Sequence, residues 1–147
     1  MSSVGNLSEH FNYQEFLCKC PECSKNGEYK IHLGLVGALE LLEIKLNKKV
    51  RIKSSYRCEE VNEKLGGNHK SFHLRGKAAH IYVDGMTPQD VFRAARDIPE
   101  VKGLGLNVDE GSVHIDLRNV ENREEWVKEK GKYVPLTADK KHVYGLE

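Results

Sequence analysis

Three histidines, His73, His80 and His114, are the residues of this chain whose type and spacing best fit metal chemistry. His73 and His80 lie in one short segment, and Gly76 between them allows the backbone to turn so that His73 reaches His80. Three imidazoles around one zinc ion leave a fourth position for water, which distinguishes a catalytic zinc site from a closed structural one. If the three side chains converge, the pattern predicts a hydrolase.

Strand alternation explains how two of these histidines come to share a face. His80 alternates with apolar residues in the predicted strand 78–83, and His114 and Asp116 do so in the predicted strand 112–117. Alternate side chains of a strand point to the same face, so one face of each strand is apolar and the other carries a histidine. Asp116 lies on the histidine face, where it is placed to orient a metal ligand or a substrate.

The elements that position these residues are predicted from hydrophobic periodicity and from helix and turn signals. They are a helix at 33–47, a strand at 50–54, a short helix at 58–65, a helix from Pro88 to about Ile98 capped by Thr87, a hairpin of strands 103–108 and 112–117, and, over residues 122–147, a helical turn followed by a packed tail. Strands separated by helices, with a hairpin at the end, predict a single α+β domain. We expect a small, mainly antiparallel sheet with helices on one face.

Composition excludes several classes of function. The chain has 147 residues, which fits one domain with a real core. Lys and Arg number 23 against 22 Asp and Glu, so no net field favours nucleic acid or an anionic membrane. No apolar run approaches the ~20 residues of a membrane span, and no signal peptide is visible. We expect a monomer with no nucleic-acid partner.

Four cysteines leave three alternatives open. Cys18, Cys20 and Cys23 form a C-x-C-x-x-C cluster, and Cys58 follows far downstream. Four thiolates suit a structural zinc ion. Two disulfides or four free buried thiols are the other interpretations of the same residues.

An ordered series of motifs resembles the M15 peptidases. The series is Phe11-x-x-x-Glu15-Phe16, Ser54-Ser-Tyr-Arg57, Asn62, Gly66-Gly67, Ser71-x-His73-x-x-Gly76-x-Ala78-Ala79 and Val113-His114-x-Asp116. It is most similar to the compact branch related to zinc D-alanyl-D-alanine carboxypeptidases and phage L-alanyl-D-glutamate endolysins, whose fold the Hedgehog signalling domain shares. Within a single domain at 1–147, the resemblance covers a core at about 9–118 and leaves 119–147 as a C-terminal tail.

The resemblance implies roles for individual residues. His73 and His114 fall on the first and third zinc ligands of the family, and Arg57 on an arginine that binds substrate and stabilises charge near the metal. Ser71 lies where the family places a polar residue at the cleft. The second ligand is normally an aspartate, and here it is His80. A three-histidine set is still a recognised zinc site, so we expect Zn²⁺ as the cofactor.

The general base is the second departure from the family pattern. Many M15 enzymes carry an acid three residues before the third ligand, where this chain has Gly111. Asp109 and Glu110 lie beside it in the predicted hairpin turn. We expect Glu110 to transfer protons, with Asp109 as the alternative.

The resemblance implies a zinc metallopeptidase that cleaves peptidoglycan stem peptides at bonds involving D-amino acids. Either a D,D-carboxypeptidase or an endolysin fits this activity. Because no signal peptide is visible in the sequence, we expect release by a phage or prophage. The alternative is a non-catalytic, zinc-containing module of the same fold that binds the cell wall, which His80 and Gly111 favour. A nucleic-acid module built on the cysteine cluster lacks a basic face.

Overall fold

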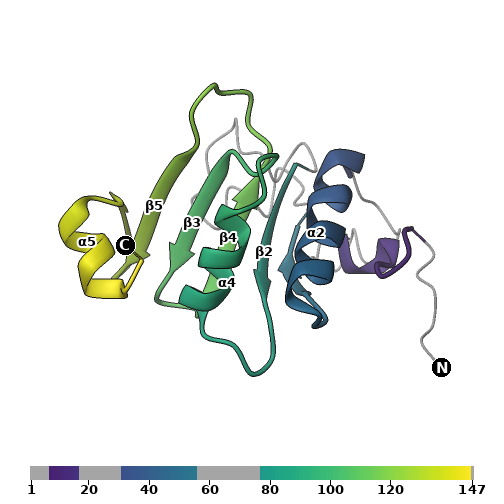
Figure 1. Cartoon of the computed structure of the whole chain (residues 1–147), viewed down its shortest axis with the longest axis horizontal. Helices are drawn as coiled ribbons and strands as arrows, with labels where there is room; N and C mark the ends of the chain where they lie inside the picture. Colours follow the sequence, from purple (N-terminus) through teal and green to yellow (C-terminus); the bar gives the residue numbers. More distant parts are fainter. Residues whose placement is uncertain (1–6, 17–30, 56–76, 147) are drawn as a thin grey trace.

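The protein is an α+β domain built on one six-stranded sheet. The structure, a computed structural model, describes residues 7–16, 31–55 and 77–146. Its elements are η1 (Tyr13–Phe16), α2 (Leu33–Leu46), β1 (Arg51–Ser54), β2 (Ala78–Tyr82), α4 (Pro88–Arg96), β3 (Gly103–Asn107), β4 (Ser112–Asp116), β5 (Glu124–Glu129), β6 (Lys132–Pro135) and α5 (Ala138–Tyr144). Helices α2 and α4 lie across one face of the sheet (Figure 1), as the sequence predicts.

The sheet has the strand order β1-β2-β4-β3-β5-β6. All neighbouring strands pair antiparallel except β3 and β5, which run parallel. Strand β4 therefore lies between β2 and β3 and receives backbone hydrogen bonds on both sides. The predicted mainly antiparallel sheet is confirmed.

Helix α2 covers one end of the sheet. Its buried residues recur at helical spacing, with Leu35, Leu39 and Leu42 fully buried, because this stripe packs onto the strands. The helix ends at Leu46, since Asn47 adopts the left-handed conformation with φ 52°. The predicted helix at 33–47 is confirmed to within one residue.

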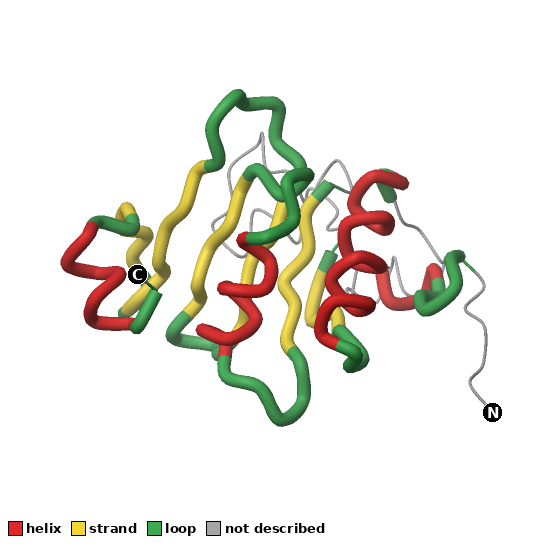
Figure 2. The backbone as a smooth tube through the Cα atoms, viewed as in Figure 1, coloured by secondary structure: helices red, strands yellow, loops and turns green. Residues whose placement is uncertain are grey.

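Helix α4 covers the middle of the sheet, in front of β3 and β4 in Figure 2. The Thr87 side chain accepts a hydrogen bond from the Asp90 amide, and Pro88 opens the first turn, as predicted. The helix ends at Arg96, two residues before the predicted end at Ile98. None of the helices in the described part of the chain is long and apolar enough to cross a lipid bilayer.

The apolar core lies between these helices and the sheet. Strands β2, β3 and β4 each contribute alternate, almost fully buried residues to it: Ala79, Ile81, Leu104, Leu106, Val113 and Ile115. The residues between them in sequence therefore point to the opposite face of the sheet. One face of the sheet thus supplies stability, and the other is left for polar side chains.

The C-terminal segment corrects the prediction. A helical turn followed by a packed tail is wrong for residues 122–147, because these residues form the strands β5 and β6 before helix α5 begins. In β5 only Val127 is buried, so the segment lacks the apolar alternation that identifies a strand. The strand forms through its backbone ladder with β3. Leu146, after α5, is fully buried in the same core.

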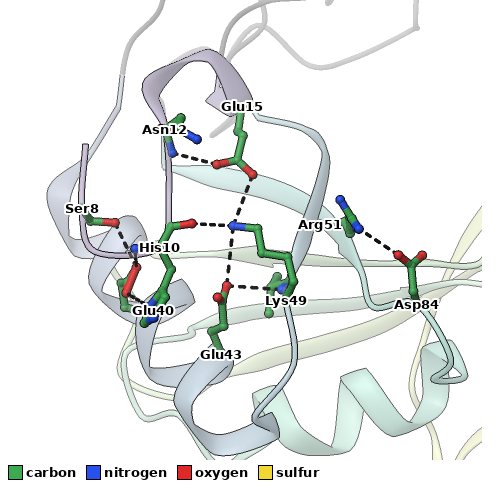
Figure 3. A network of polar contacts seen from close by, with 10 residues as sticks. Ser8, His10, Asn12, Glu15, Glu40, Glu43, Lys49, Arg51 and Asp84 are labelled. Atoms are coloured by element: carbon green, nitrogen blue, oxygen red, sulfur yellow. Dashed lines mark hydrogen bonds and ion pairs between the residues drawn. The ribbon is translucent and has the colours of Figure 1, made fainter. Parts of the chain in front are cut away.

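Glu40 of α2 ties the N-terminal segment to the helix layer (Figure 3). Its Oε1 accepts hydrogen bonds from Ser8 Oγ at 3.0 Å and from the His10 amide at 2.8 Å. Its Oε2 lies 2.8 Å from Nδ1 of the His10 ring. The carboxylate is therefore held by partners from one short segment on both of its oxygens.

Lys49 adds a second link to the same segment. Its ammonium group donates to the His10 carbonyl and lies 3.5 Å from Glu15 Oε1 and 3.8 Å from Glu43 Oε2. It also lies 4.0 Å from the ring centroid of Phe11, which is fully buried. These contacts place residues 7–16 against the start of β1.

The His10–Glu40 pair predicts a pH-dependent stability. The hydrogen bond that His10 donates to Glu40 raises the pKa of His10 above its ordinary 6.5. Burial raises the pKa of Glu40, but the hydrogen bonds from His10 and Ser8 outweigh it and lower that pKa below 4.5. The contribution of His10 is complete below pH 6.5 and is lost as the pH rises through the raised pKa. The contribution of Glu40 is present above pH 4.5 and is lost as the pH falls through the lowered pKa.

We expect Glu40→Gln to lower the melting temperature most between about pH 4.5 and 6.5, where both partners are charged. Thermal unfolding at pH 3, 5.5 and 9 measures the effect, with the exposed Glu100→Gln as the matched control. A loss of stability that is the same at all three pH values would show that the charged pair contributes nothing.

Candidate metal-binding face of the sheet

His80 and His114 lie directly opposite each other on neighbouring strands. They are register partners in the antiparallel pair β2 and β4. Their ring centroids are 5.2 Å apart, and Nε2 of His80 lies 3.1 Å from Nδ1 of His114. Both side chains are half-buried, on the face of the sheet away from the apolar core. The predicted shared face is confirmed for these two histidines.

The distance between the two ring nitrogens is compatible with their binding to one zinc ion. Two nitrogens bound to one tetrahedral zinc at ~2.0–2.1 Å lie about 3.3 Å apart. The observed separation of 3.1 Å between Nε2 of His80 and Nδ1 of His114 is close to that value. Neutral imidazoles are ordinary zinc ligands, so these side chains supply two of the donors that such a site needs.

The other predicted site residues lie outside the described residues. His73, Arg57 and Ser71 all fall within residues 56–76. The predicted short helix at 58–65 and the four cysteines, Cys18, Cys20, Cys23 and Cys58, also lie outside the described part of the chain. These assignments remain predictions.

Asp116 lies directly behind His114. Its side chain is fully buried, and Oδ2 is 2.6 Å from Nε2 of His114. Arg118 donates from Nε to Oδ1 at 2.9 Å, from Nη2 to Oδ2 at 2.7 Å and from its backbone amide to Oδ1 at 3.1 Å. Both carboxylate oxygens are therefore engaged, which favours the orienting role predicted for Asp116 over direct contact with a substrate.

These contacts fix the charge on Asp116. Burial raises its pKa, but the hydrogen bonds from Arg118 and His114, together with the positive charge of Arg118, outweigh burial and hold the pKa well below its usual range. An ionised carboxylate only accepts hydrogen bonds, so Nε2 of His114 carries the proton in this contact. In the neutral ring, Nδ1 then keeps its lone pair, and Nδ1 is the nitrogen beside His80. The contact therefore leaves Nδ1 as the ring nitrogen of His114 that is available to bind a metal ion.

Two glycines of β3 make room for this arrangement. Gly103 is paired with Asp116 and Gly105 with His114. A Cβ on Gly103 would lie 2.3 Å from both carboxylate oxygens of Asp116, and one on Gly105 would lie 2.3 Å from Nε1 of Trp126. The neighbouring side chains thus lie over the bare backbone of β3. The Gly-x-Gly spacing of β3 is the sequence signal that could have revealed this.

The hairpin turn between β3 and β4 contains the two predicted candidates for a general base. Asp109 accepts hydrogen bonds from the amides of Lys130 at 2.8 Å and Gly131 at 2.9 Å, and these bonds lower its pKa. Asp109 therefore joins this turn to the turn between β5 and β6. Glu110 is half-exposed and lies 3.6 Å from Nζ of Lys53. Of the two, Glu110 is the carboxylate less engaged by backbone amides.

Glu9, His10 and Glu40 form a second group that could hold a metal ion among the described residues. Their potential ligand atoms lie within 4.8 Å of one another. This group lies at α2, the helix layer on the other side of the sheet from His80. Glu40 already accepts three hydrogen bonds there, from Ser8 and His10. The group is therefore explained by its structural role, which is to join the N-terminal segment to helix α2.

The close approach of Asp116 to β3 predicts the effect of a single methyl group. We expect Gly103→Ala to destabilise the protein by roughly 1–3 kcal/mol, because the buried carboxylate must move away from its partners. Gly37→Ala is the matched control, since a Cβ there meets nothing within 4 Å. In helix α2 the same change should stabilise by roughly 0.5–1 kcal/mol. Urea unfolding measures both, and equal effects would show that Asp116 is free to shift.

Comparison with known proteins supports the resemblance seen in the motifs. Residues 9–116 match the family model described as Peptidase M15. No curated protein matches the chain. The matched segment ends at Asp116, so Arg118 and the strands β5 and β6 lie beyond it.

Proposed function

Because this chain belongs to the peptidase M15 family, we propose that it is a zinc-dependent peptidase that cleaves peptidoglycan stem peptides at bonds involving D-amino acids. The observation that supports it most is the facing pair His80 and His114, with ligand nitrogens 3.1 Å apart on the polar face of the sheet. A D,D-carboxypeptidase and an endolysin are the two forms of this activity. Action on the bacterial cell wall follows from either.

His73, His80 and His114 would hold the metal ion. Bound there, zinc would supply Lewis-acid polarisation of the scissile carbonyl and lower the pKa of a water ligand. His80 replaces the aspartate that is usual in the family, so the ligand set has one negative charge fewer. Asp116 restores a carboxylate next to the site, although it touches His114 and not the ligand position itself.

The remaining roles belong to side chains around these ligands. Arg57 would bind the oxygen that gains charge as the peptide bond is attacked, because a guanidinium stays charged and offers a rigid set of donors. Glu110 would take a proton from the attacking water and pass it to the leaving amine. Ser71 would contact the substrate at the edge of the cleft.

A non-catalytic module that binds zinc and cell-wall peptides is the second candidate. The observation that favours it is the pair of departures at His80 and Gly111, which remove a ligand carboxylate and the usual position of the base. In this case the metal would organise the site, and peptides would bind without being cleaved.

Metal analysis tests the histidine site. We expect the purified chain to lose about one zinc ion on His114→Ala, because one of three ligands is removed. His142→Ala, which changes an exposed histidine of α5, is the matched control and should keep its zinc. Comparison in a Cys20→Ser background separates any zinc held by the cysteines. Unchanged zinc content in His114→Ala would contradict the histidine site.

Cleavage of purified muropeptides, followed by mass spectrometry, separates the two functions. We expect the zinc-loaded protein to release fragments cut beside a D-amino acid, and His114→Ala to release none. Binding without cleavage across several stem-peptide chemistries would support the non-catalytic module instead. In that event, cleavage by His80→Asp would identify the ligand change as the cause.

A further inference from the structure

Arg118 holds Asp116 with two parallel hydrogen bonds. Nε donates to Oδ1 at 2.9 Å and Nη2 donates to Oδ2 at 2.7 Å, so the planes of the guanidinium and the carboxylate are matched. The third nitrogen, Nη1, donates to Oε2 of Glu124 at 2.6 Å. The hydrogen bonds to Asp116 and Glu124 raise the pKa of Arg118, with burial acting against them. The arginine therefore links the end of β4 to the start of β5.

Trp126 packs against both Arg118 and His114. The guanidinium carbon of Arg118 lies 4.8 Å from the centroid of the Trp126 ring. The His114 ring lies 5.1 Å from the same indole, tilted by 52°. Gly105, the register partner of both His114 and Trp126, leaves the space that the indole fills. One aromatic ring thus contacts the proposed metal ligand and the arginine behind it.

We propose that Arg118, held by Glu124 and Trp126, is a positioning residue that fixes the ring orientation and the Nε2–H tautomer of His114 through Asp116. The fork of Arg118 sets the plane of the carboxylate, so Oδ2 points at Nε2 of the ring and Nδ1 is presented beside His80. The part of this inference that concerns metal affinity rests on the zinc site proposed above, whereas the tautomer does not.

The residues that perform this role come from outside the family match. Arg118, Glu124 and Trp126 all follow residue 116, where the matched segment ends. Strand β5 places Glu124 and Trp126 beside Gly103 and Gly105 of β3. The C-terminal strand therefore contributes to the site and does more than extend the sheet.

Lysine cannot replace this arginine in the proposed role. Its ammonium group keeps the positive charge but lacks the planar fork that sets the carboxylate. Arg118→Lys thus separates charge from geometry, and Arg118→Met removes both. Arg123→Met is the matched control. Arg123 donates to the backbone carbonyls of Arg96, Ile98 and Val101, so its loss weakens the fold without touching Asp116.

The first measurement reads the tautomer in the purified full chain. Long-range ¹H–¹⁵N spectra of histidine-labelled protein should show a proton on Nε2 of His114, shifted downfield and slow to exchange. We expect Arg118→Met to give a mixture of tautomers and faster exchange, with a smaller change in Arg118→Lys. Arg123→Met should keep the wild-type spectrum even where its melting temperature falls. If Arg118→Met does not fold, Arg118→Lys supplies the comparison.

The second measurement is zinc affinity, determined by competition with a chromogenic chelator. Loss of a residue that orients a ligand lowers metal affinity by about 10-fold to 100-fold, which we expect for Arg118→Met. Arg123→Met should bind zinc as the wild type does. A single Nε2–H tautomer and unchanged zinc affinity in both Arg118 variants would overturn the proposal. Absence of muropeptide cleavage alongside the predicted tautomer and affinity changes would overturn the peptidase assignment and support the positioning role.

Discussion

The buried carboxylate of Asp116 is the constraint on which the polar face of the sheet depends. A fully buried charge is unfavourable unless charged and hydrogen-bonding partners surround it. Here the partners are the ring of His114 and the fork and amide of Arg118. Because β4 is paired on both sides, this carboxylate cannot shift without disturbing the strands next to it. The orientation of His114 thus follows from the need to pair a buried charge.

The two faces of the sheet divide stability from chemistry. Alternation along β2 and β4 puts Ile81, Val113 and Ile115 against the helices and leaves His80 and His114 on the opposite side. The apolar face tolerates changes that keep volume. The polar face is less tolerant, because His80, His114 and Asp116 are each held by a contact with a specific neighbour. Substitutions on this face should therefore affect the site, and at a close contact such as that of Gly103 with Asp116 they should also lower the stability of the fold.

The sequence predicted those parts of the molecule whose signals are local. Helix α4 was readable from Thr87 and Pro88, and the shared face of His80 and His114 from period-two alternation. Strand β5 was not readable, because it has one buried residue and forms through pairing with β3, about twenty residues earlier. For the same reason Arg118 resembles an ordinary surface charge in the sequence. Asp109 likewise looked available, since its partners, the amides of Lys130 and Gly131, come from another turn.

The pairing of β5 with β3 also determines which strands form the edges of the sheet. In the described part of the chain the outer strands are β1 and β6. Strand β1 carries Arg51 and Lys53, and strand β6 carries Lys132 and Pro135. Charged residues and proline on an edge strand discourage pairing with other chains. A chain cut after the family match would instead expose β3, whose sequence Gly-Leu-Gly-Leu-Asn has no charge. The last thirty residues thus cover an uncharged edge of the sheet with a charged one.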